Sequence, residues 1–281
     1  MLVSEPSLPT PHQRRPRAVS TWHPGRADPF QTLASGEVRT TEEPLQVRLI
    51  DGFELRYGSD PVELPRSCQR LIGFLALWER PVLRSFVSGN LWPDSDTEHA
   101  NASLRSTLWR LPNGRGQRLV RVTAGQLALD ESVHVDYRDA LAWSRAVLAD
   151  SAGPLPAPWT LSEISVLSRE VLPDWYDEWV LLARERFRQL RLHALESLCQ
   201  QLAAVGRFGE ALLAGLGAVA IEPLRESAHR QVIAVHLLEH NFVEAIRQYH
   251  SYERLLFEEL SLQPSAELRA MVVALRTPTT A

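Results

Sequence analysis

The run EHANASLRSTLWRL, residues 98–111, gathers side chains that could bind a phosphate group or the edge of a base. Arginine donates bidentate hydrogen bonds to phosphate and to guanine, and hydroxyl groups suit phosphates and base edges. The candidates in this run are Ser103, Arg105, Ser106, Thr107 and Arg110. Leu104, Leu108 and Leu111 recur at helical spacing. We therefore predict a helix that buries its leucines and exposes a basic, hydroxyl-rich face.

Further basic side chains flank this run on both sides. The candidates outside the helix are Arg66, Ser67, Arg70, Arg84, Arg115, Arg118 and Arg121. Between Arg66 and Arg121 we count nine arginines against four acids, a net charge of +5, so the rest of the chain carries −9 of the total of −4. Such asymmetry is typical of a segment that faces an anionic partner. The alternative is an ordinary exposed helix with solvated arginines.

The elements that must position these residues begin with a hairpin. LQVRLI (45–50) and FELRYG (53–58) are predicted strands joined by the turn Asp51-Gly52, and VEL (62–64) is a candidate third strand. A helix capped by Ser67 follows, whose N-terminus can hold a phosphate. Its predicted buried residues are Cys68, Leu71, Ile72 and Leu75.

Two more helices and a second hairpin complete this region. We predict a helix over roughly residues 84–91, and then the helix of the leucine run, opened by a capping box of Ser95 and Glu98. RLVRV (118–122) and QLALD (126–130) form the hairpin. Strands, three helices and a hairpin follow one another in the order of a winged helix-turn-helix. We expect Trp109 to pack beneath this wing rather than to contact DNA.

From about residue 133 the pattern is helical, apart from the Pro-rich loop AGPLPAPW at 152–159. Side chains recur here at a spacing of 34 residues, the period of tetratricopeptide repeats. The recurring pairs are Phe208 and Phe242, Glu210 and Glu244, Ala211 and Ala245, and Ala194 and Ala228. Such helical stacks form concave surfaces for protein or peptide partners. We expect the aromatic run Trp175, Tyr176 and Trp179 to pack in the core or between domains.

Three segments resemble the Streptomyces antibiotic regulatory protein (SARP) family: LIDGFELRYGSDPVELP, LWPDSDTEHANASLRSTLWRL and VHVDYRDALAW. Residues 45–136 look like its winged-helix DNA-binding domain. The stretch from residue 167 to residue 268 resembles the bacterial transcriptional activator domain that follows it in that family. Gln126, where the family's wing usually has an aromatic residue, and Pro112, which shortens the third helix, depart from the pattern.

The predicted organisation has three parts. Residues 1–42 are a Pro- and Arg-rich tail with too few apolar side chains to fold. Residues 43–131 are an α+β winged helix-turn-helix domain, and residues 132–281 are an all-α, tetratricopeptide-like activator domain. The fold class is therefore mixed.

Several classes of protein are not expected. No apolar run is long enough to span a membrane, and the two cysteines, far apart, suit a reduced cytoplasm. No phosphate-binding loop or metal-binding spacing is present, and His229, His236 and His240 lack supporting ligands. We therefore expect no enzyme activity, cofactor or metal.

Two functions remain open. The first is a transcriptional activator that binds repeats in double-stranded promoter DNA through the third helix. By the resemblance, such an activator would contact RNA polymerase or a second protomer and would be a pathway-specific actinobacterial regulator. The alternative is an adaptor that does not bind DNA and whose helical repeats bind a peptide or protein.

Overall fold

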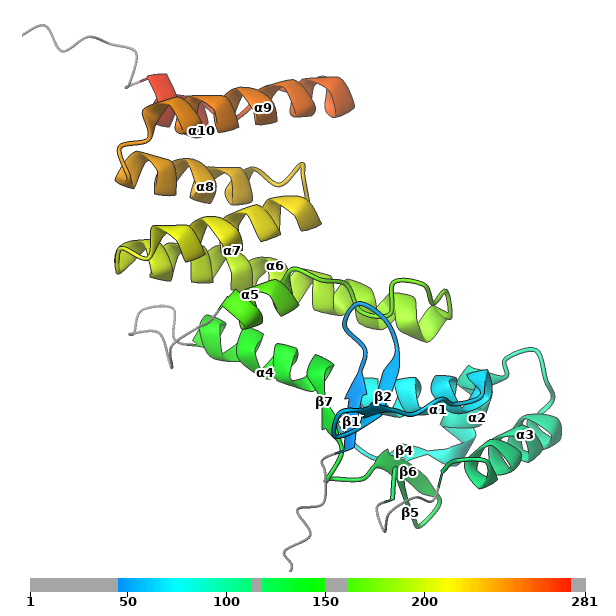
Figure 1. Cartoon of the computed structure of the whole chain (residues 1–281). Coiled ribbons are helices and arrows are strands. Elements are labelled where there is room, and N and C mark those ends of the chain that lie inside the picture. The colour runs from blue at the N-terminus through cyan, green and yellow to red at the C-terminus, as the bar shows by residue number, and fades with distance from the viewer. Residues whose placement is uncertain (1–44, 113–117, 150–160, 274–281) are drawn as a thin grey trace, which may run out of the picture. The chain divides into compact units, whose positions relative to one another are not determined.

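The computed structural model describes residues 45–112, 118–149 and 161–273 (Figure 1). The predicted tail, the Pro-rich loop at 152–159 and Arg115 lie outside the described residues. The described chain is mostly helical, with two small sheets in its N-terminal part. From residue 136 onward its elements are helices, apart from an isolated β-bridge between Val171 and Ile50. None of the described helices is both long enough and apolar enough to cross a membrane.

The first sheet has the strand order β3-β2-β1-β7. β1 (Leu45–Arg48) and β2 (Glu54–Tyr57) are antiparallel, and β7 (His134–Val135) runs parallel to β1. Asp51 and Gly52 have φ angles of 71° and 136°, which confirms the predicted hairpin turn. The third strand, β3 (Asp60–Pro61), ends before the predicted residues 62–64, because the chain leaves the sheet to begin a helix after Pro65.

Three helices follow: α1 (Arg66–Leu77), α2 (Arg84–Leu91) and α3 (Thr97–Trp109). The bounds of α2 agree with the prediction, but both predicted caps were wrong. α1 starts directly after Pro65, whose carbonyl accepts hydrogen bonds from the next turn, so Ser67 lies inside the helix. At α3 the Asp96 carboxylate accepts a 2.9 Å hydrogen bond from the backbone N–H of His99, and Asp96 takes the place predicted for Ser95.

The second sheet contains the predicted hairpin, β5 (Val120–Thr123) and β6 (Gln126–Leu129), whose turn uses Ala124 and Gly125 with φ angles of 45° and 80°. β6 also pairs with β4 (Val82–Leu83), which directly precedes α2. A strand of two residues is too short to be predicted from the sequence pattern. β4 forms because it pairs with β6. The sheet therefore ties the hairpin to the start of α2.

The C-terminal half is a series of helices: α4 (Asp136–Ala149), α5 (Leu161–Leu167), α6 (Glu178–Ala204), α7 (Phe208–Ile221), α8 (Glu226–Leu238), α9 (Phe242–Leu260) and α10 (Ala266–Val273). From α6 to α10, each helix packs against the next in the chain (Figure 1). The helical prediction for this region is confirmed.

The spacing of 34 residues is visible in the helix turns. Gly206 before α7 and His240 before α9 have left-handed φ angles of 76° and 61°. Each donates its backbone N–H to the carbonyl three residues earlier, over 3.0 and 3.1 Å. Ala211 and Ala245 are both fully buried one turn into the helix that follows. A small side chain at this position lets neighbouring helices approach closely, as the repeat predicts.

One buried histidine makes the stability of this half sensitive to pH. Nε2 of His229 lies 2.8 Å from the carbonyl of Pro223, and Nδ1 lies 2.9 Å from Nε2 of Gln248. The ring also stacks on Tyr252 at 4.3 Å. The carbonyl can only accept, so these partners select the neutral ring with its hydrogen on Nε2. Burial lowers the pKa of His229 below its ordinary value of 6.5, against the opposing influences of the Pro223 carbonyl and of Glu226.

We expect the free energy of unfolding to fall as the pH drops from 7 to 5, because the unfolded chain binds a proton that folded His229 resists. Each unit by which the pKa is lowered corresponds to about 1.4 kcal/mol. Urea denaturation of the wild type and of His229→Gln at both pH values measures the effect. The wild type should lose more stability than the variant across this range, and equal losses would contradict the assignment.

Candidate nucleic-acid interface

The exposed face at the C-terminal end of α3 presents Arg105, Ser106 and Trp109. Arg110, the C-cap residue, is exposed beside them. Ser103 is half-buried at the edge of this face. Within the described part of the chain, no ion pair or hydrogen bond occupies the guanidinium of Arg105 or Arg110. The two arginines can therefore donate to a partner outside the chain.

Two residues of this helix do not lie where the sequence predicted. Thr107 is 3% exposed, so its predicted place on the exposed face was wrong. Trp109 is 89% exposed, so the expectation that it packs beneath the wing was wrong as well. The buried stripe follows Ala100, Leu104, Thr107 and Leu111. Leu108 is only half-buried at the edge of that stripe, because the helix turns Thr107 toward α1.

A buried contact between Thr107 and α1 accompanies this rotation. The Cys68 thiol lies 3.6 Å from the Thr107 carbonyl oxygen in a buried position. Burial raises the pKa of Cys68, which keeps its thiol protonated and a hydrogen-bond donor.

A polar contact that sequence reasoning missed joins α2 and α3. The Ser88 hydroxyl, buried on α2, lies 3.0 Å from Oδ1 of Asn101 on α3. The same hydroxyl lies 3.2 Å from the Ser85 carbonyl oxygen in its own helix, so the contact with Asn101 adds a polar link between α2 and α3. The only signal in the sequence is a serine beside the apolar Val87 and Leu91.

The hairpin is anchored on the same helix. The backbone N–H of Arg84, the first residue of α2, donates a 3.0 Å hydrogen bond to the carbonyl of Gly125 in the hairpin turn. α3 and the hairpin are thus both held by α2. Arg118 is exposed, and Arg121 forms a 2.6 Å ion pair with Glu131 at the surface.

The remaining predicted residues, Arg66 and Arg70, contact the segment before α6. Arg70 forms a 2.5 Å ion pair with Asp177, and the Arg66 guanidinium lies 4.0 Å from the ring centroid of Trp175. Ser67 beside them is half-buried. The two arginines at the start of α1 therefore contact the helical half of the chain. They differ in this from Arg105 and Arg110, which have no partner among the described residues.

Aromatic packing strengthens this junction. Trp175 is buried and stacks on Phe53 at 5.7 Å, and Trp179 meets the ring of Phe74 edge-on at 5.2 Å. A Cβ atom at Gly73 would come within 3.1 Å of the Trp175 ring, so glycine permits the close approach. The expected packing role is confirmed for the two tryptophans, whereas Tyr176 is exposed.

Side chains of the metal-ligating types and both cysteines lie within the described ranges. Within them, no group of three or more His, Cys, Asp or Glu side chains could hold a metal ion. Both cysteines are buried, and burial raises the pKa of Cys199 to about 12. A thiol that stays protonated at neutral pH is a poor nucleophile.

Comparisons with known proteins agree with this architecture. Residues 159–276 match the family model of the bacterial transcriptional activator domain. No curated protein matches the chain. Among solved structures, the chain is similar to Mycobacterium tuberculosis EmbR in complex with a low-affinity phosphopeptide, with a TM-score of 0.62 and 19% identity. The match covers 84% of this chain and 66% of the EmbR chain. This likeness shows a shared fold.

Proposed function

We propose that this chain, whose residues 159–276 match the bacterial transcriptional activator domain, is a SARP-like transcription regulator that binds promoter DNA sequence-specifically and activates transcription. In this proposal residues 43–131 act as a winged helix-turn-helix domain, in which α3 is the recognition helix and the β5–β6 hairpin is the wing. Residues 132–281 act as the activator domain.

One observation carries the proposal: an exposed helix face whose two arginines have no partner among the described residues. The major groove is about 12 Å wide and admits a helix, and arginine reads guanine through two hydrogen bonds. We assign Arg105 and Arg110 to base edges or phosphates and Ser106 to either. Trp109, at the same face, offers a large ring for contact with the sugar-phosphate backbone or a thymine methyl group.

The other basic residues take supporting roles in this proposal. Arg84 and Arg118 would contact phosphates beside the groove, since both α2 and the hairpin flank α3. Arg121 would do so by exchanging its exposed ion pair with Glu131 for a phosphate. Arg66 and Arg70 are proposed to hold the two halves of the chain together instead, because their charges already face Trp175 and Asp177. Ser103 and Ser67, both half-buried, would at most reach a phosphate at the edge of the interface.

The activator domain is proposed to contact RNA polymerase or a second protomer. Helical stacks with a repeated unit offer long surfaces to protein partners. α9 supports this role, because Phe242, Val243, Phe257 and Leu260 leave large apolar side chains exposed on it. Two protomers on adjacent DNA repeats would bring such surfaces together.

A salt titration tests the proposal. Duplexes that the full chain selects from a random-sequence library should bind it with a log–log salt slope of about −5 to −9. This range follows from two protomers that each neutralise about three to five phosphates. Fluorescence anisotropy between 50 and 200 mM salt measures the slope, with a scrambled duplex of equal length as the control.

The adaptor alternative makes a different prediction for the same experiment. A chain whose winged helix is only a scaffold should select no sequence and should give a slope near zero. Equal affinity for the selected and the scrambled duplex would leave only nonspecific DNA binding and would overturn the proposal of a sequence-specific regulator.

A further inference from the structure

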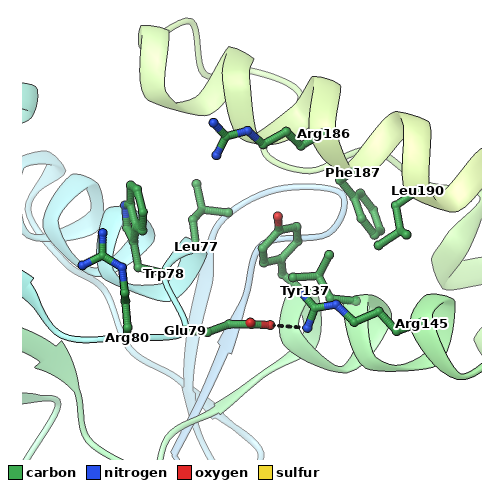
Figure 2. Close-up of a pocket in the computed structure, with 10 residues that line it drawn as sticks. Leu77, Trp78, Glu79, Arg80, Tyr137, Arg145, Arg186, Phe187 and Leu190 are labelled. Atoms are coloured by element: carbon green, nitrogen blue, oxygen red, sulfur yellow. Dashed lines mark hydrogen bonds and ion pairs between the residues drawn. The ribbon is translucent and has the colours of Figure 1, made fainter.

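A pocket of about 590 Å³ opens between the end of α1, the start of α4 and the middle of α6 (Figure 2). Leu77, Trp78, Tyr137 and Phe187 supply much of its apolar lining. A second hollow of about 320 Å³ shares Leu77, Trp78, Tyr137 and Arg186 with it. Sites for small organic ligands typically occupy about 300 to 1,000 Å³ and are mostly apolar with a few polar groups.

Tyr137 places an unsatisfied polar group in this apolar lining. The residue is 5% exposed, and its ring packs edge-on against Phe187 at 5.3 Å. Across the described residues no hydrogen bond reaches its hydroxyl, which Figure 2 shows directed into the space between Leu77 and Phe187. Burial raises the pKa of Tyr137 to about 12, so the hydroxyl remains a donor at neutral pH. Solvent reaches the hydroxyl through the pocket, so this donor is open to a ligand that enters there.

The charges around the pocket favour an anion. Three arginines, Arg80, Arg145 and Arg186, surround it, against the single acid Glu79. Glu79 is already paired with Arg145 at 2.8 Å, and Arg80 lies over the ring of Trp78. Arg186 has no ion pair with any residue that the structure describes. Figure 2 shows Arg186 on α6 at the side of the pocket toward which the Tyr137 hydroxyl points.

From this geometry we propose that the pocket binds a small organic anion with an aromatic or branched aliphatic body. The acid group of the ligand contacts Arg186 and accepts a hydrogen bond from the Tyr137 hydroxyl. The apolar body packs among Leu77, Trp78 and Phe187. This site is separate from the exposed face of α3, and the inference does not depend on the proposed DNA binding.

The site is built from both halves of the chain. Ligand binding can therefore be measured through the thermal stability of the folded chain. The end of α1 and its C-cap supply Leu77 and Trp78, whereas α4 and α6 supply Tyr137, Arg186 and Phe187. The pocket exists only when these helices pack together. A ligand that binds the folded chain alone raises its thermal midpoint in proportion to the logarithm of ligand concentration.

The test uses two fluorescent probes of similar shape and different charge. 8-Anilinonaphthalene-1-sulfonate carries an acid group on an aromatic body, and N-phenyl-1-naphthylamine is its uncharged counterpart. We expect one sulfonate probe to bind per full chain. We also expect Arg186→Gln to weaken that binding about tenfold, because a charge-assisted hydrogen bond is lost. Tyr137→Phe, which keeps the ring, should weaken it about threefold or more.

Two controls make the result decisive. Arg254→Gln, an exposed arginine on α9, should leave sulfonate binding unchanged, and Arg186→Gln should leave binding of the uncharged probe unchanged. Circular dichroism confirms that each variant is folded. Equal sulfonate affinity in Arg186→Gln and Arg254→Gln would overturn the inference. A loss of both probes in Arg186→Gln would also overturn it, because the arginine would then support only apolar packing.

Discussion

Leu104→Ala is expected to lower the free energy of unfolding by about 2 to 5 kcal/mol. Leu104 is fully buried in the contact between α3 and the rest of the N-terminal part. Truncation to alanine removes apolar burial and leaves a cavity that the fixed backbone of α1 and α2 cannot fill. Urea denaturation followed by circular dichroism measures the loss.

Leu108→Ala is the matched control for this prediction. Leu108 is only half-buried on the same helix, so the same chemical change should cost less than half as much. The sequence periodicity treats the two leucines alike, whereas the structure separates them. Equal losses for the two variants would mean that α3 packs in the orientation that the periodicity predicted, and a larger loss for Leu108→Ala would contradict the observed burial of Leu104.

The double variant Arg105→Ala/Arg110→Ala is expected to lose about 2 to 6 kcal/mol of binding free energy on a selected duplex. Each arginine that reads a base contributes about 1 to 3 kcal/mol, and the two sites should add if they contact different bases. The thermal midpoint should move little, because both side chains are exposed. Anisotropy titrations and thermal denaturation of the same samples measure the two effects.

The single variants distinguish the two kinds of contact. If one arginine contacts only a phosphate, its loss should weaken all sequences alike and flatten the salt slope by about one unit. Arg254→Ala on α9 serves as the control for the loss of one exposed positive charge. Unchanged binding by the double variant would show that α3 is not the recognition helix.

Features that depend on neighbouring residues could be predicted from the sequence. The turn at Asp51-Gly52 forms because these residues tolerate positive φ angles, and the strands beside it alternate in burial. The bounds of α2 follow from the apolar pattern of residues 84–91 and the proline after Trp92. The period of 34 residues is confirmed by the matching turns at Gly206 and His240. The resemblance to the activator domain agrees with the match over residues 159–276.

The contribution of each candidate residue to DNA binding and the three-part domain division remain predictions. The charge pattern could identify which segment carries free arginines, because charge follows directly from residue type. It could not separate Arg70, which faces Asp177, from Arg110, which has no partner among the described residues. The two positions of the ion pair lie 107 residues apart, and local pattern carries no information on such a contact.

Tertiary contacts decided the details of the site. The periodicity of leucines allows several rotations of α3, and packing in the folded chain buries Thr107 and exposes Trp109. β4 forms because β6 lies beside it. The pocket beside Tyr137 arises only where α1, α4 and α6 meet. Sequence therefore determined the local elements and the charge of this protein, through propensities and spacing within a few residues. Which faces became interfaces depended on packing between distant segments, because burial is a property of the assembled core.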